Sequence, residues 1–170
     1  PSIMDVPSMF AAAQLVGETV REVIKTASDG GLQSEATFSA TFILGGQVAG
    51  GQPRMFLIYP EGNFIEATSD NPFFQIGEHK YGKPILVRAY NENMSFEEAT
   101  KLMIVSFDST LKSNLSVGLP LDMQIYERDT LRRGFEKRFL ADDTYYRRIS
   151  DGWSDALRLA FDSLPDFQMN

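Results

Sequence analysis

The 170-residue sequence contains no cysteine, and this excludes several kinds of site. Without thiols the chain can form no disulfide, no cysteine nucleophile and none of the common zinc sites. Its one histidine, His79, supplies too few nitrogen ligands for a metal on its own, so an exposed loop residue is the better interpretation. We therefore expect no metal or other cofactor. The lack of cysteine also fits a reducing compartment, and we expect the cytoplasm.

Basic residues are outnumbered by acidic ones, and long apolar runs are missing. Lys and Arg total 16 against 23 Asp and Glu, a formal net charge of −7 that repels nucleic-acid phosphates and anionic lipids. No apolar run approaches the roughly 20 residues that span a bilayer. We expect neither a nucleic-acid nor a membrane partner. A hydrophobic content of 43% is enough for one packed domain, residues 1–170.

The first residue leaves two interpretations open. Pro1 could be a processed N-terminal proline that acts as a catalytic base, as in some tautomerases, or the sequence could belong to a longer protein. Pro7 interrupts any strand that Pro1 could begin, whereas residues 5–8 are typical of the approach to a helix. A longer protein is the better interpretation.

A long helix is predicted from Ser95, where Ser95 and Glu98 form a capping box. Along it, four charged residues are spaced as one solvated row: Glu97, Lys101, Asp108 and Lys112. The helix leads into a polar loop, residues 113–118. Further helices are expected from Ser8 to the glycines at 30 and 31, around residues 85–89, and after residue 143. Asp142 and Asp143 resemble paired catalytic carboxylates, but an N-cap from either one is the better account.

Six segments have the composition of strands, namely residues 37–44, 55–59, 64–67, 73–76, 121–126 and 135–140. The glycine-rich residues 45–51 lack the Lys-Ser/Thr ending of a phosphate loop and precede a strand, so we predict a hairpin turn. The order of elements is one helix, four strands, two helices, two strands and a helix. It favours an α+β fold, a four-layer αββα sandwich of two antiparallel sheets flanked by helices.

Four segments together resemble the proteasome β-subunit family of N-terminal-nucleophile hydrolases, and most closely its bacterial branch called Anbu: residues 42–47 (FILGGQ), 57–64 (LIYPEGNF), 75–84 (QIGEHKYGKP) and 109–118 (STLKSNLSVG). The resemblance implies a threonine-type peptidase, whose mature N-terminal threonine supplies the nucleophilic hydroxyl and whose free amine is the general base. In that family the threonine, a lysine and the oxyanion amide precede the helix predicted at Ser8. This chain would then be the C-terminal two thirds of a subunit, a fold incomplete at its N-terminus.

The resemblance also implies partners. Identical subunits would associate in a ring or open spiral, and the substrate would be a peptide or an unfolded protein, with an unidentified unfoldase as a further partner. Two alternatives stay open: a non-catalytic structural or assembly subunit, and a binding domain with the same fold.

Supporting site residues follow from matching positions in the family. Its Asp-x-x-Ser-Gly motif corresponds to residues 113–117, so Ser116 carries over while Ser113 replaces the carboxylate. Its Gly-Ser-Gly corresponds to Gly77, Glu78 and His79, which makes Glu78 a candidate for the missing negative charge and places Gly77 and His79 at the substrate. The simpler alternatives are a helix C-cap at residues 113–114 and a solvated or intersubunit role for Glu78.

Overall fold

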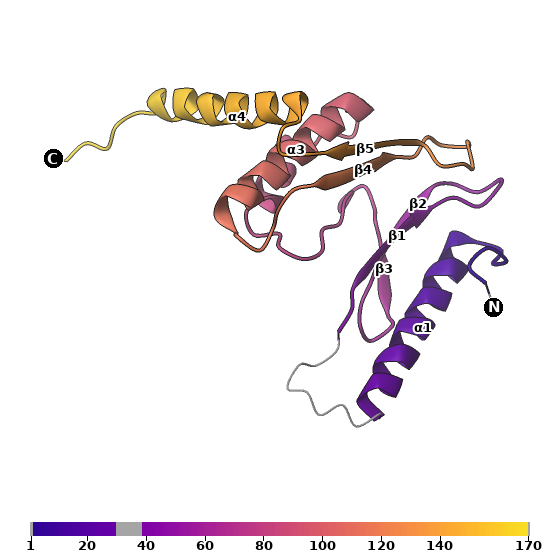
Figure 1. Ribbon diagram of the computed structural model, residues 1–170. Coiled ribbons are helices and arrows are strands. Elements are labelled where there is room, and N and C mark those ends of the chain that lie inside the picture. Colours follow the sequence, from indigo (N-terminus) through magenta and orange to yellow (C-terminus); the bar gives the residue numbers. More distant parts are fainter. Residues whose placement is uncertain (1, 30–38, 170) are drawn as a thin grey trace. The chain divides into compact units, whose positions relative to one another are not determined.

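Figure 1 shows the computed structural model of the chain, which describes residues 2–29 and 39–169. Within these ranges four helices and two antiparallel sheets follow the order α1, β1 to β3, α2, α3, β4 to β5, α4. The predicted α+β class, with antiparallel sheets and helices, is confirmed. The chain divides into two compact units: residues 1–77 with 126–134 form the first, and residues 78–125 with 135–170 the second. A single domain over 1–170 stays a prediction.

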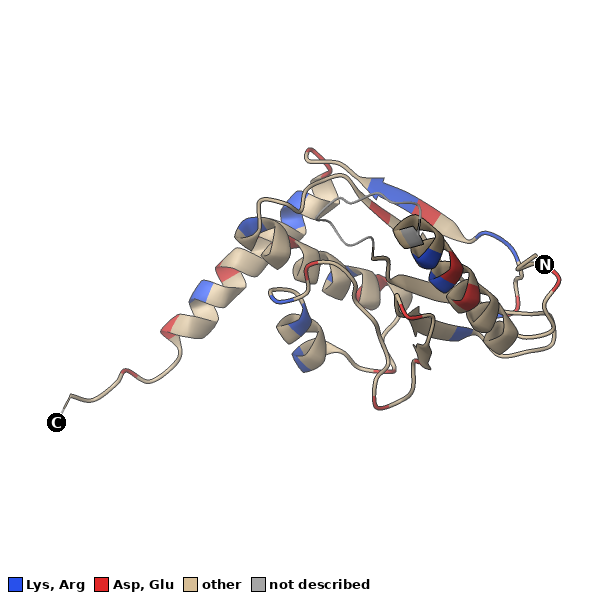
Figure 2. Cartoon of the chain, turned by 90° about the horizontal axis from the view of Figure 1, so that it is seen from below, with Lys and Arg blue, Asp and Glu red and all other residues tan. Residues whose placement is uncertain are grey.

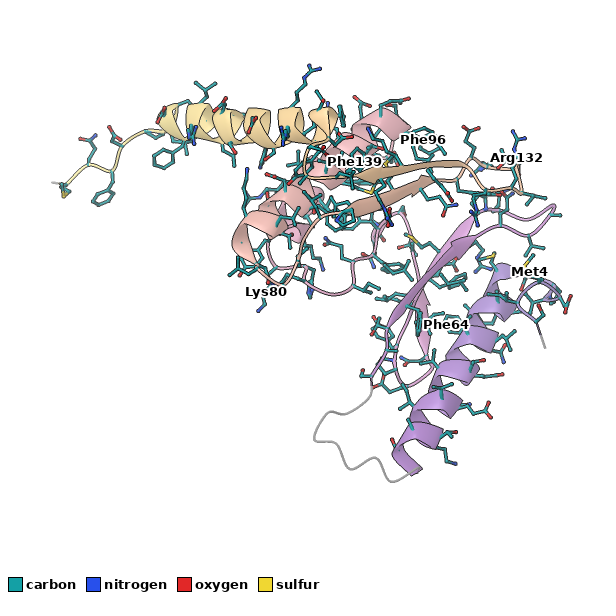
Figure 3. All side chains as sticks on the ribbon, viewed as in Figure 1. Met4, Phe64, Lys80, Phe96, Arg132 and Phe139 are labelled. Carbon is teal, nitrogen blue, oxygen red and sulfur yellow. The ribbon has the colours of Figure 1, made fainter. Side chains whose placement is uncertain are left out.

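The first unit packs one helix on a three-stranded sheet. β2 (Arg54–Ile58) lies between β1 (Phe42–Gly46) and β3 (Phe64–Glu66) and pairs antiparallel with both. α1 (Met9–Asp29) contacts β2 and β3. Phe56 and Ile58 are fully buried. Phe64, labelled in Figure 3, packs edge-to-face on Phe10 of α1 and on Phe56 at centroid distances of 5.3 and 5.6 Å. The aromatic cluster therefore joins the helix to the sheet.

Two glycines allow α1 to approach the β2–β3 turn closely. A Cβ atom at Gly17 would lie 2.2 Å from the carbonyl oxygen of Gly62, and one at Gly62 would lie 2.7 Å from that of Gly17. These atoms belong to rigid backbone, which cannot rotate away as a side chain can. The distance between helix and turn is consequently set by the absence of side chains at both positions.

Gln47 joins two loops of the first unit that are far apart in the sequence. Its Nε2 donates to Gly51 O at 2.7 Å and to Asp129 Oδ1, while its Oε1 accepts from Tyr126 Oη at 2.9 Å and from Asp129 N at 2.8 Å. Both donors and both acceptor positions of the amide are thereby used. The loop of residues 126–134, which connects β4 to β5, is held by the β1–β2 hairpin.

The second unit is built around α3 (Phe96–Ser113), which contacts α2 (Lys83–Ala89) and α4 (Thr144–Asp162). β4 (Leu121–Ile125) and β5 (Phe135–Phe139) form its antiparallel sheet. Ile104, Phe139 and Tyr146 make the buried core, in which Figure 3 labels Phe139. The predicted capping box is confirmed, because Ser95 and Glu98 each accept from the other's backbone N–H, at 3.2 and 3.0 Å.

Two predictions about strands need correction. Residues 73–76 form no strand, although their apolar composition predicts one; the chain before them closes on itself through paired backbone bonds between Thr68 and Asn71, leaving an isolated bridge. The strand predicted at 37–44 begins only at Phe42 and continues through Gly45 and Gly46. Residues 37 and 38, and the glycines at 30 and 31, lie outside the described residues.

Asp108 is not in a solvated row, contrary to the prediction. It is 1% exposed, and its Oδ1 accepts a hydrogen bond from Tyr146 Oη at 3.0 Å. The i,i+4 pair with Lys112 exists, with 3.0 Å between Lys112 Nζ and Asp108 Oδ2, but only the lysine end reaches solvent. Tyr146 of α4 covers the carboxylate, so the burial of Asp108 cannot be predicted from the sequence of α3 alone.

Charged residues of both signs lie along α1 and α4 (Figure 2). Over residues 2–29 and 39–169, none of the helices combines the length and the apolar content needed to cross a membrane.

Asp143, and not Asp142, is the N-cap of α4. Its Oδ1 accepts from Tyr146 N at 2.9 Å, and its Oδ2 lies 3.1 Å from Lys137 Nζ. These contacts lower the pKa of Asp143, and the hydrogen bond from Tyr146 N has the largest effect.

We expect Asp143→Ala to lower the melting temperature by about 3 °C at pH 7, and Asp142→Ala to change it by less than about 1 °C. The pKa of Asp143 is lowered in the folded state. The loss of melting temperature in Asp143→Ala should therefore be complete above the ordinary carboxyl pKa of about 4, and it should vanish as the pH falls through the lowered pKa. Equal effects of both variants at pH 7 would argue against the cap.

Candidate functional site

Glu78 is the charged centre of the candidate site. It is half-buried at the start of the second unit, and its Oε1 accepts from the backbone N–H of Lys80 at 2.9 Å. Its Oε2 accepts from Asn114 Nδ2 at 2.9 Å. The pKa of Glu78 lies below its ordinary value, chiefly because of the bond from Lys80 N, with further contributions from Asn114 and from the backbone of His79. The carboxylate is therefore ionised at neutral pH.

Asn114 connects Glu78 to the loop after α3. It is the C-cap of that helix, with its N–H donating to Thr110 O at 2.8 Å. Its Oδ1 accepts from the backbone N–H of Ser116 at 2.9 Å and from Ser116 Oγ at 2.7 Å. The side-chain amide of Asn114 thus links Glu78, through its nitrogen, to Ser116, through its oxygen. We call Glu78, Asn114 and Ser116 the Glu78 cluster.

The structure brings together only some of the predicted site residues. Ser116 and Glu78 belong to the cluster, but Ser113 Oγ donates to Ser109 O of its own helix at 2.8 Å. Gly77 is exposed in a left-handed conformation, with φ of 76°, a value that favours glycine. His79 accepts at its carbonyl oxygen from Lys83 N at 3.0 Å, which links the site segment to the first turn of α2.

Asn114 is the member of the cluster whose bridging role the sequence analysis missed. The predicted C-cap is confirmed, yet the side chain does more than end the helix. An asparagine whose side chain bonds the backbone two residues on is typical of Asx turns, and the Ser-Asn-Leu-Ser sequence at 113–116 carries that signal. The bond to Glu78, 36 residues earlier, has no such local signal.

The cluster can hold a cation by charge, and it can accept hydrogen bonds. Ser116 donates its hydroxyl hydrogen to Asn114, so its oxygen is left as an acceptor, and the ionised Glu78 is likewise an acceptor. An ammonium group placed against these oxygens would be stabilised in its protonated form. Within residues 2–29 and 39–169 no three His, Asp or Glu side chains converge as a metal site would require.

The Asn114 bond is expected to contribute measurably to the ionisation of Glu78. Asn114→Ala removes the side-chain donor, and the pKa of Glu78 should rise toward its ordinary value because one bond to the charged form is lost. A ¹³C NMR titration of the Glu78 carboxyl measures this directly. Ser113→Ala is the matched control, since Ser113 bonds to its own helix, and it should leave the titration of Glu78 in place. The same shift in both variants would show that the loop, and not the amide, sets the pKa.

Comparison with families of known proteins places the chain among proteasome subunits. The model described as proteasome subunit matches residues 15–124, which is more than half of the chain. No curated protein matches the sequence.

Solved structures match over almost the whole chain. Anbu from Hyphomicrobium sp. strain MC1 is 54% identical with a TM-score of 0.90, and the match covers 99% of this chain and 68% of that one. Anbu from Yersinia bercovieri, described as an ancestral beta-subunit, is 46% identical with a TM-score of 0.91, covering 99% and 70%. The helical assembly of the Anbu complex from Pseudomonas aeruginosa is 47% identical with a TM-score of 0.91, covering 97% and 68%.

Proposed function

The chain belongs to the proteasome subunit family, and from this we propose that it is part of a threonine-type peptidase subunit that hydrolyses peptide bonds inside an assembly of identical copies. The observation that carries the proposal is the 54% identity to an Anbu structure over 99% of the chain. In this proposal the nucleophile and general base belong to an N-terminal threonine outside these 170 residues.

The Glu78 cluster supports the proposal by its charge. The free α-amine of an N-terminal residue titrates near pH 8, so a neighbouring carboxylate would raise its pKa and stabilise the ammonium that forms as the hydroxyl attacks. Glu78 supplies such a carboxylate, and the bond from Asn114 fixes one of its oxygens. In this proposal Glu78 and Ser116 support the reaction, and Gly77 and His79 border the substrate.

We further propose that identical subunits associate, in a ring or an open spiral, and that peptides or unfolded proteins are the substrates. The relative from Pseudomonas aeruginosa is described as a helical assembly, which supports repeated contacts between copies. Enclosure in such an assembly would limit substrates to chains that can enter it.

A non-catalytic subunit is the second candidate, and the position of Ser113 favours it. This residue stands where the family has a carboxylate, and its hydroxyl bonds back to Ser109 and does not reach the Glu78 cluster. A subunit without a working amine would still form walls and interfaces.

The experiment that separates the candidates starts from the complete gene product. Intact-mass measurement and N-terminal sequencing identify the mature first residue, and a fluorogenic peptide measures hydrolysis. The peptidase proposal expects an N-terminal threonine, serine or cysteine whose replacement by alanine abolishes turnover. Residues 1–170 alone should hydrolyse no peptide, because nucleophile, base and oxyanion donor are all missing. A different first residue, with assembly intact, would establish the non-catalytic role.

A further inference from the structure

A buried carboxylate lies in α3, outside the Glu78 cluster. Asp108 is 1% exposed, with Oδ1 bonded to Tyr146 Oη and Oδ2 paired with Lys112 Nζ, each at 3.0 Å. Burial raises the pKa of Tyr146 to about 12, so its phenol remains a donor to Asp108. Removing a carboxylate from water is costly, and apolar residues of similar size would hold α3 on α4 at least as firmly. A role in orienting the helix accounts for the charge better than a role in stability does.

Lys112 extends this arrangement across to α4. Its Nζ lies 3.0 Å from Ser150 Oγ and 3.0 Å from Ser154 Oγ, in addition to Asp108. The ammonium donates hydrogen bonds to the two serine hydroxyls, and its contact with Asp108 is an ion pair. We call Asp108, Lys112, Tyr146, Ser150 and Ser154 the α3–α4 polar network. The network fixes the distance between the last turn of α3 and α4. It also restricts rotation of that turn about the helix axis, because hydrogen bonds are directional.

The turn held in this way carries Asn114, two residues after Lys112. On another side of α3, Gly82 lies against Ser106 and Thr110, since a Cβ at Gly82 would be 2.3 Å from Ser106 Oγ and 3.2 Å from Thr110 Oγ1. Gly82 ends the segment that begins with Glu78. Both partners of the Glu78–Asn114 bond are therefore placed by the C-terminal half of α3. A displacement of more than about 0.6 Å would stretch that 2.9 Å bond beyond the hydrogen-bond range of about 3.5 Å.

We propose that Asp108 and Lys112 are positioning residues: through the α3–α4 polar network they hold the end of α3 so that Asn114 meets Glu78. Neither residue touches the Glu78 cluster directly, and the effect passes through the backbone of the last helical turn. α4 thereby contributes to the site although none of its residues lies in the cluster.

The test uses the chain as it is and needs no peptidase activity. Lys112→Met keeps the apolar stem of a half-exposed side chain and removes the ammonium. We expect hydrogen exchange of the Ser116 amide, which donates to Asn114, to become about tenfold faster, and the pKa of Glu78 to rise. Lys101→Met removes the same charge from an exposed site of the same helix and should change neither quantity.

Asp108→Asn separates positioning from simple electrostatics. Loss of a negative charge would by itself lower the pKa of Glu78, whereas loss of the Asn114 bond would raise it, so the two explanations predict opposite shifts. Lys80 is the charged side chain that acts on Glu78 directly, and it is unchanged in these variants. An upward shift with Asp108→Asn supports the proposal. A downward or absent shift in that variant, or unchanged Ser116 exchange in Lys112→Met, overturns it. If Asp108→Asn does not fold, Ser116 exchange in Lys112→Met and in its control decides alone, because loss of the ammonium would by itself also raise the pKa of Glu78.

One further arm rests on the proposed function. In a subunit that hydrolyses peptides, Lys112→Met should lower kcat about tenfold without changing KM, and should have no further effect when Glu78→Gln is already present. Additive losses would show that Lys112 acts elsewhere. Lack of peptidase activity in the wild-type subunit would count against the proposed function. The NMR measurements would still test whether Asp108 and Lys112 are positioning residues.

Discussion

Glu78→Gln should slow peptide hydrolysis by about ten- to a thousandfold in a peptidase subunit that contains this chain. Glutamine keeps the size of the side chain and one oxygen, which can accept from Asn114 or from Lys80 N but not from both, and it removes the charge. Without that charge the ammonium formed during attack is less stable, and the amine has a lower pKa. The rising limb of the pH–rate profile, which reports this amine, should accordingly move to lower pH while the plateau falls.

Two further measurements make this result specific. Ser113→Ala should have a smaller effect than Glu78→Gln, because Ser113 bonds to its own helix and stays outside the cluster. Sedimentation of the Glu78→Gln variant should show unchanged assembly. A pH profile that stays in place while the assembly changes would instead assign Glu78 to an interface between subunits.

Gly17→Ala is expected to destabilise the first unit by about 3 kcal/mol. Alanine favours a helix over glycine by about 1 kcal/mol, but here its Cβ would lie 2.2 Å from the backbone oxygen of Gly62. The helix must then move off the sheet, and overpacking of this kind costs more than the propensity gains. Hydrogen exchange of the Phe56 and Ile58 amides, in the centre of β2, measures the opening free energy of this unit.

Gly152→Ala provides the matched control. Gly152 is also in the interior of a helix, α4, and a Cβ there would meet no other atom within 4 Å. The same substitution should therefore stabilise the second unit by up to about 1 kcal/mol. If Gly17→Ala were also neutral or stabilising, the close approach of α1 to the β2–β3 turn would be wrong.

Features set by neighbouring residues were predictable from the sequence. The capping box at Ser95 and Glu98 and the N-cap before α4 depend on side chains within three residues of the backbone they bind. The helices follow from apolar periodicity, which reports a buried face without naming its partner. Glu78 could be singled out by its charge and by the family resemblance, which the comparisons confirm.

Features that need a distant partner were missed. Asp108 has the spacing of an exposed ion pair, and its burial depends on Tyr146, 38 residues later. Residues 73–76 have the composition of a strand, but a strand also requires an edge with which to pair, and composition does not show one. The Glu78–Asn114 bond spans 36 residues and needs both loops to be placed first.

The hydrogen bonds of Gln47 bear on how this chain can be divided. The chain passes from one unit to the other between residues 77 and 78, 125 and 126, and 134 and 135, so neither unit is a continuous stretch of sequence. A fragment ending at Gly77 would retain Gln47 but lose Tyr126 and Asp129, its partners 79 and 82 residues away. Two separately expressed fragments would therefore each lack part of a unit. When segments are exchanged between related proteins, Gln47 should be kept together with residues 126–134. The two loops form one structural unit although they are far apart in the sequence.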